Sequence, residues 1–101
     1  MKVLLKRPNE KFEEIEIENT LEAMQSLVNG YIECIPTDIS DKLFMVVNEE
    51  GKLYDLEPNF YYYTDIIVGN AVFVRVDNNG NWKSISNKQI DEIKKYFGNN
   101  I

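Results

Sequence analysis

Histidine is absent from the 101-residue chain, and cysteine occurs only once, at Cys34. Because catalysis of the Ser-His or Cys-His kind needs an imidazole to accept the proton, that route is excluded. A lone cysteine forms no disulfide within the chain, and without histidine a structural zinc site is excluded as well. We therefore predict no metal and no cofactor. We also predict that Cys34 is a small buried hydrophobic residue rather than a reactive thiol.

Glycine, proline and long apolar stretches are also scarce. The five glycines form neither the phosphate loop of nucleotide hydrolases nor the Gly-x-Gly-x-x-Gly turn of dinucleotide-binding folds. No stretch approaches the roughly 18 to 20 consecutive apolar residues of a membrane helix, and residues 1–8 regain charge too soon for a signal peptide. We predict an unprocessed cytoplasmic protein that makes no contact with membranes.

Positive charge is in the minority, with 11 basic residues against 17 acidic ones and a net charge of -6. Binding to nucleic-acid backbones depends on lysine and arginine, so direct nucleic-acid binding is disfavoured. Two interpretations of the acidity remain open. It serves solubility alone, or it attracts a partner protein with a basic surface, such as the groove of a nucleic-acid enzyme.

Five glutamates are the predicted protein-binding residues. The segment 14–18 alternates strictly, which predicts a strand with isoleucines on its buried face and carboxylates on its exposed face. A second acidic feature is the tight turn at 48–51. The glutamates of the strand and the turn are Glu14, Glu16, Glu18, Glu49 and Glu50.

The hydrophobic pattern predicts a single α+β domain over residues 1–101. A hydrophobic content of 44% is enough for one packed core. Strands are expected at 1–6, 14–18, 31–36, 43–47, 52–56, 71–76 and 82–85, with Gly51 at positive φ in the turn before 52–56. Helices are expected at 21–28, with a left-handed stop at Asn29-Gly30, and between a Ser86 cap and Gly98. These elements predict one mixed, mostly antiparallel sheet with two short helices on one face.

The most unusual local feature is a block of four aromatic residues, 60–63. Four consecutive aromatics cannot all face one core, so some of them are expected to be exposed or to cover a cavity. Tyrosines are favoured in recognition surfaces, and bases of nucleotides stack on such rings. The predicted small-molecule site consists of Asn59, Tyr61, Tyr62, Tyr63 and Asp65. The alternative interpretation assigns half of the block to the core.

Several ordered segments resemble one known family. They are 15–23, Val28-Asn29-Gly30-Tyr31-Ile32-Glu33, Asn48-Glu49-Glu50-Gly51-Lys52-Leu53, Pro58-Asn59 and 65–69. In this order they resemble the family called domain of unknown function 3846, over Met1 to about Ser86. The resemblance implies a small accessory protein of a phage, a plasmid or its bacterial host that acts in the bacterial cytoplasm. It implies no particular activity.

Three hypotheses for function follow. The first is a non-enzymatic binding protein of a mobile element, a counter-defence factor that blocks a host nuclease or similar protein through an acidic surface. The second is a protein that sequesters a nucleotide signal, for which a homodimer is a possible form. The third is a structural or regulatory module. Carboxylate pairs such as Asp38 with Asp41 can catalyse hydrolysis, but turn chemistry explains each pair, so we predict no enzyme.

Overall fold

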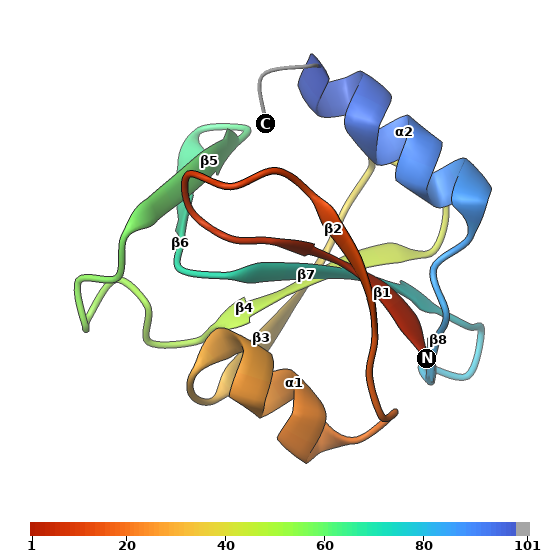
Figure 1. The fold of residues 1–101 in the computed structure, drawn as a ribbon, viewed down its shortest axis with the longest axis horizontal. Coiled ribbons are helices and arrows are strands. Elements are labelled where there is room, and N and C mark those ends of the chain that lie inside the picture. Colours follow the sequence, from red (N-terminus) through yellow and green to blue (C-terminus); the bar gives the residue numbers. More distant parts are fainter. Residues whose placement is uncertain (99–101) are drawn as a thin grey trace.

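An antiparallel sheet forms the centre of the computed structural model, which describes residues 1–98 (Figure 1). Five strands lie in the order β2-β1-β7-β4-β3, and a short sixth strand, β8, pairs with β7. Their bounds are β1 Lys2–Lys6, β2 Glu13–Glu16, β3 Ile32–Pro36, β4 Leu43–Asn48, β7 Ala71–Val76 and β8 Trp82–Lys83. The predicted α+β class is therefore confirmed. All pairings among the described strands are antiparallel, so the sheet is not mixed.

A second, two-stranded sheet stands apart from the first. It consists of β5 (Pro58–Tyr62) and β6 (Asp65–Val68), which form a hairpin with a register shift between Pro58 and Phe60. The prediction of a single sheet was therefore wrong. The reason is that the aromatic block supplies its own strand, which pairs with the next segment of the chain rather than with the main sheet.

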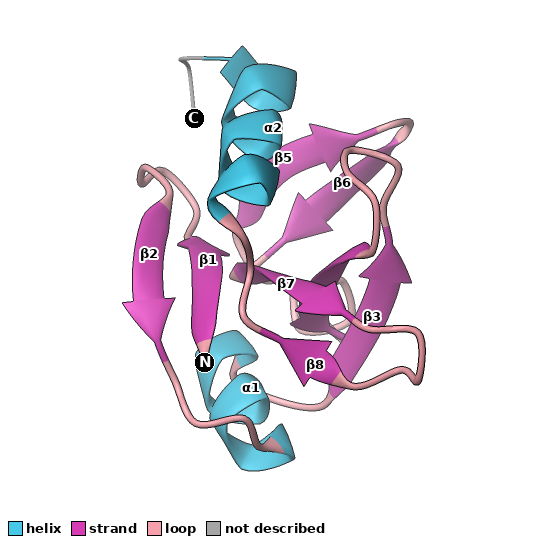
Figure 2. Cartoon of the chain, turned by 90° about the vertical axis from the view of Figure 1, so that its right-hand side faces the viewer, coloured by secondary structure: helices cyan, strands magenta, loops and turns pink. Residues whose placement is uncertain are grey.

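The two helices lie on opposite faces of the main sheet (Figures 1 and 2). The helix α1 (Leu21–Val28) buries Met24 and Val28 in one core cluster, and α2 (Asn87–Phe97) buries Ile90 and Ile93 in another. The prediction that both helices cover one face was therefore wrong. Strands β1, β4 and β7 are apolar on both sides, so each face of the sheet needs its own cover.

The ends of both helices follow the sequence signals. The hydroxyl of Thr20 accepts a hydrogen bond from the Ala23 N–H at 3.1 Å, and α1 ends at Asn29 with a φ of 63°. Ser86 and Gln89 form a reciprocal capping box at the start of α2. In the described part of the chain, neither helix has the length and apolar character that crossing a bilayer requires.

Residues 51–55 form turns, where a strand over 52–56 was predicted. The N–H of Tyr54 donates to the Glu50 carbonyl at 3.0 Å, and that of Leu56 donates to the Gly51 carbonyl at 3.0 Å. The prediction failed because β4 is already paired on both sides, with β3 and β7, and leaves no edge for a returning strand. The role predicted for Gly51 was also wrong, since positive φ occurs at Asp55 instead. A Cβ at Gly51 would lie 2.9 Å from Val68 Cγ2, so close approach is what requires glycine there.

Candidate functional site

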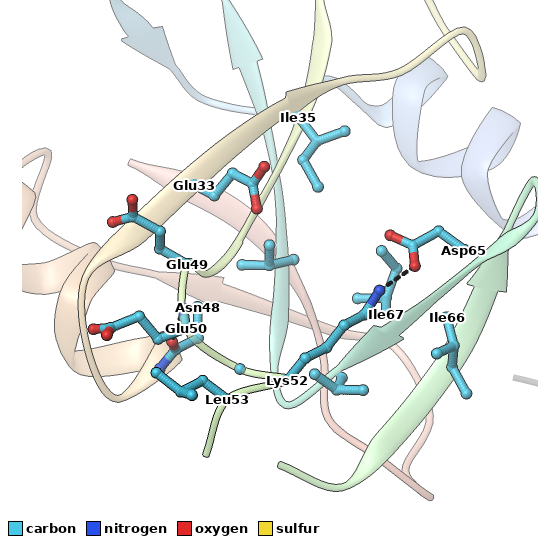
Figure 3. Close-up of a pocket in the computed structure, with 13 residues that line it drawn as sticks. Glu33, Ile35, Asn48, Glu49, Glu50, Lys52, Leu53, Asp65, Ile66 and Ile67 are labelled. Carbon is cyan, nitrogen blue, oxygen red and sulfur yellow. Dashed lines mark hydrogen bonds and ion pairs between the residues drawn. The ribbon is translucent and has the colours of Figure 1, made fainter. Parts of the chain in front are cut away.

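A groove of about 290 Å³ opens between β3, the turn that follows β4, and β6 (Figure 3). Its apolar lining includes Ile35 from β3, Val47 from β4 and Ile67 from β6. Carboxylates from three separate segments stand around this lining, namely Glu33, Glu49, Glu50 and Asp65. The groove thus combines an apolar floor with an acidic rim.

The rim carries an excess of negative charge. Lys52 is the one cation among the described residues that line the groove, and its Nζ forms an ion pair with Asp65 (Figure 3). Four carboxylates and one lysine leave three negative charges on the rim. Glu33, Glu49 and Glu50 have no ion-pair partner among residues 1–98. These three carboxylates are therefore available to a ligand. No cluster of three metal-binding side chains occurs within the same residues.

Asn48, which is buried, holds the acidic turn in place. Its Nδ2 donates to the Val28 and Asn29 carbonyls at 3.0 and 3.3 Å, and its Oδ1 accepts from the Glu50 N–H at 2.8 Å. A Cβ at Gly30 would lie 2.8 Å from Asn48 Nδ2, so the glycine makes room for this amide. The sequence indicated only a turn at Asn48. One signal could have revealed its structural role, namely that Asn48 is a polar residue at the end of the otherwise apolar strand β4.

A second hollow, of about 370 Å³, lies on the other side of Glu50. Tyr31 and Tyr54 line it and are 66% and 63% exposed. Asn29, the C-cap of α1, lines it too, and the last turn of α1 contains no basic residue. Helix C-termini and aromatic faces both attract cations. Glu50 lines both hollows, so the acidic turn stands between two sites suited to positive charge.

The hydrogen bonds at the two ends of β3 establish which residues of this strand pair with β4. The Glu49 N–H donates to the Tyr31 carbonyl at 2.8 Å, and the Thr37 N–H donates to the Leu43 carbonyl at 3.0 Å. Hydrogen-bonded pairs alternate along an antiparallel ladder. The odd-numbered residues of β3 therefore bond to β4, and the even-numbered residues turn their backbone groups away from it.

The outer edge of β3 is unpaired among the described residues, because β3 is the last strand in the sheet order. Ile32 and Cys34 direct both their N–H and their C=O groups to this edge. Pro36 has no N–H and contributes only a carbonyl. The edge borders the groove, since Glu33 and Ile35 belong to the same strand and line it.

The predicted acidic residues do not form one surface. Glu14 and Glu16 lie on β2, at the opposite edge of the sheet from β3, and Glu18 follows that strand. Glu14 pairs with Lys2 Nζ at 3.7 Å, and Glu16 pairs with the N-terminal ammonium group at 3.3 Å. Only Glu49 and Glu50 of the five predicted glutamates line the groove.

The aromatic block divides between core and surface, as the sequence predicted. Phe60 is only 7% exposed and stacks on Phe73 with ring centroids 6.1 Å apart. Tyr61 is 70% exposed. Tyr63 takes a left-handed φ of 55° just beyond the end of β5.

Asp38 holds the two other tyrosines of the block. The Tyr62 hydroxyl donates to Asp38 Oδ1 at 2.9 Å and accepts from the Asp38 N–H at 3.1 Å. The Tyr63 hydroxyl donates to the second carboxylate oxygen of Asp38. Burial raises the pKa of the Tyr62 phenol, the hydrogen bond from the Asp38 backbone N–H acts in the opposite direction, and the Asp38 carboxylate raises the pKa further. The Tyr62 hydroxyl thus stays protonated, as a donor to a carboxylate, near neutral pH.

The amide of Asn59 is engaged within the fold. Its Nδ2 donates to the carbonyls of Lys6 and Gly69, both at 2.8 Å, and its Oδ1 accepts from Lys6 Nζ at 3.1 Å. Lys6 is 3% exposed, and burial lowers its pKa. Of the residues predicted for a small-molecule site, only Asp65 lines the groove.

Cys34 is exposed, which corrects the prediction that it is a buried hydrophobic residue. The correction follows from its place on an edge strand, where one side of the residue has no neighbour. Partial desolvation of the sulfur nevertheless raises the pKa of the thiol, the nearby Glu33 carboxylate raises it further, and the Trp82 side chain acts in the opposite direction.

We expect the alkylation of Cys34 by iodoacetamide to reach its half-maximal rate at a higher pH than the alkylation of an ordinary cysteine. The thiolate is the reacting form, so a raised pKa leaves less of it at any pH below the midpoint. Glu33→Gln removes one cause of the shift and should move the profile to lower pH, still above the ordinary value because desolvation remains. Mass spectrometry of alkylation rates against pH measures both profiles. A wild-type midpoint at or below that of N-acetylcysteine amide, which carries no carboxylate, would contradict the expectation.

A family model described as "Domain of unknown function (DUF3846)" matches residues 1–98. Neither the curated proteins nor the solved structures contain a match to the chain.

Proposed function

The chain belongs to the DUF3846 family, a domain of unknown function, and from its groove we propose that it is a non-enzymatic protein that binds a basic partner. The observation that carries the proposal is that Glu33, Glu49 and Glu50 line one groove and have no ion-pair partners among the described residues. Such carboxylates attract lysine and arginine side chains, and their summed field speeds encounter with a basic surface.

The apolar floor of the groove contributes binding free energy that the charges alone do not supply. Exposed ion pairs contribute up to about 1 kcal/mol each, so a few of them give only weak binding. Burial of apolar side chains against Ile35 and Ile67 contributes roughly 25 cal/mol for each Å² removed from water. A partner that offers basic and apolar side chains together therefore fits the groove best.

The family resemblance implies a phage or plasmid protein, and this setting suggests that the partner is a protein of the bacterial host. In a protein of a phage or plasmid that acts in the bacterial cytoplasm, a natural target is a host protein with a basic groove, such as a nuclease. We propose that occupation of that basic groove blocks the host protein, which makes this chain a counter-defence inhibitor.

The nucleotide alternative has less support. The hydroxyls of Tyr62 and Tyr63 are held by the Asp38 carboxylate, which would repel a phosphate group. Lys52, the one cation among the described residues that line the groove, is paired with Asp65. A purely structural module, the third hypothesis, requires no partner at all.

Capture from bacterial lysate followed by reconstitution tests the proposal. The tagged protein is incubated with lysate at about 50 mM salt, retained proteins are identified by mass spectrometry, and candidates are purified. We expect a basic protein whose dissociation constant rises at least about tenfold between 50 and 300 mM salt, because screening weakens exposed ion pairs. The proposal would be wrong if the purified candidate bound this protein with an affinity that does not change with salt. It would also be wrong if no purified candidate bound.

A further inference from the structure

We infer that the partner enters as an extended segment that adds a new strand to the free edge of β3, with its basic side chains over the acidic groove. The inference rests on the proposed function and specifies how the partner binds. Two N–H groups and three carbonyls, from Ile32, Cys34 and Pro36, face outward on this edge. Addition of a strand to such an edge supplies main-chain hydrogen bonds irrespective of the side chains of the partner.

The two faces of β3 specify the sequence pattern of the added strand. Side chains alternate between faces, so Glu33 and Ile35 lie on the groove face while Ile32 and Cys34 lie on the face covered by α1. Cross-strand neighbours of opposite charge stabilise a pair, and like charges destabilise it. The segment that fits therefore alternates, with basic residues on the groove face and apolar residues on the other. This charge pattern also selects which face of the added strand lies over the groove, because a slip by one residue would turn the basic side chains away from Glu33.

A second copy of this chain fits the edge poorly. Two β3 strands that pair in antiparallel fashion within one continuous sheet would bring the two grooves onto the same face, side by side. Each rim carries three negative charges that its own lysine does not balance. The resulting repulsion favours a basic partner over self-association.

The strand itself indicates how to block its edge without unfolding it. Pro36 already occupies β3 at an outward-facing position, where the missing N–H costs no bond to β4. Cys34→Pro places a second proline at an equivalent position. It removes one outward N–H and puts a ring in the path of an added strand. Cys34→Ala is the matched control, since it alters the side chain and keeps the N–H.

The experiment uses a seven-residue peptide of alternating lysine and valine with the ¹⁵N-labelled protein at low salt. We expect hydrogen exchange at the Ile32 and Cys34 amides to slow at least about tenfold when the peptide saturates the protein, because a new strand accepts both hydrogen bonds. Cys34→Pro should weaken peptide binding at least about tenfold relative to Cys34→Ala, which keeps the Cys34 N–H. A peptide whose backbone is N-methylated on its pairing edge should bind the unmodified protein about as weakly as the unmodified peptide binds Cys34→Pro.

The outcomes separate the inference from the function on which it rests. If the peptide binds in a salt-dependent way but leaves exchange at Ile32 and Cys34 unaltered, strand addition is wrong and the acidic binding function stands. If the peptide does not bind even at low salt, both fail. The exchange measurement uses the unmodified protein, so it decides the question even if Cys34→Pro does not fold.

Discussion

Replacement of Phe60 by alanine is expected to lower the free energy of unfolding by about 3–5 kcal/mol, whereas replacement of its neighbour Tyr61 should change it by about 0.5 kcal/mol or less. Phe60 is buried among Phe73 and Phe97, with ring centroids 6.1 and 5.0 Å away. Truncation of its side chain removes these aromatic contacts and leaves a cavity. Tyr61 is 70% exposed and loses little when it is shortened.

The loss at Phe60 should be large relative to the whole stability of the protein. Small domains are stable by only about 5–15 kcal/mol, so such a variant is close to unfolding at ordinary temperature. Urea denaturation followed by circular dichroism measures both variants. Equal destabilisation by Phe60→Ala and Tyr61→Ala would mean that the two rings are buried alike and that the assignment of core and surface in this block is wrong.

Phe60 also matters for the candidate site. It belongs to the β5–β6 hairpin, which forms no ladder with the main sheet and attaches to it through buried side chains such as Phe60 and Ile67. The same hairpin supplies Asp65 and Ile67 to the groove. A variant of Phe60 that remains folded is therefore expected to bind the basic peptide more weakly, because one wall of the groove is less well held.

Most secondary-structure elements could be predicted from the sequence because their signals are local. The capping box at Ser86 and the left-handed stop at Asn29 each depend on a few neighbouring residues, and both formed as expected. Which residues of the aromatic block face the core could not be predicted from the sequence of the block itself. Phe60 is its buried member because β5 pairs with β6 in a separate hairpin, and that pairing is a tertiary choice.

The parts of the site that could not be predicted depend on strand order. The acidic strand near Glu14 and the acidic turn at Glu49 were both recognised, but nothing local shows that they end at opposite edges of one sheet. Glu33 was missed for the same reason, since a single glutamate in an apolar strand carries no signal until β3 proves to be an edge strand. The side of the sheet that each helix covers is likewise decided by packing rather than by helix periodicity.

Reversal of the charge of the acidic turn is expected to weaken binding of the alternating lysine-valine peptide by about 100-fold. Glu49→Lys with Glu50→Lys turns two attractions into two repulsions. If each reversal costs about 1–1.5 kcal/mol, the sum approaches 3 kcal/mol, and every 1.4 kcal/mol is a factor of ten in affinity. The turn should still fold, because Asn48 receives its hydrogen bond from the Glu50 backbone N–H rather than from the Glu50 carboxylate. Isothermal titration calorimetry measures the change.

The matched control reverses Glu14 and Glu16 on the opposite edge of the sheet. Each double variant replaces two negative charges with two positive ones, which takes the net charge from -6 to -2 in both cases. Any difference between them therefore reports the position of the charges and not their number. We expect the control to bind within about threefold of the unmodified protein, because Glu14 and Glu16 lie at the opposite edge of the sheet, where screening by salt weakens their attraction to the peptide. Equal losses in both variants would show that only total charge matters, and a larger loss in the control would move the binding site to β2.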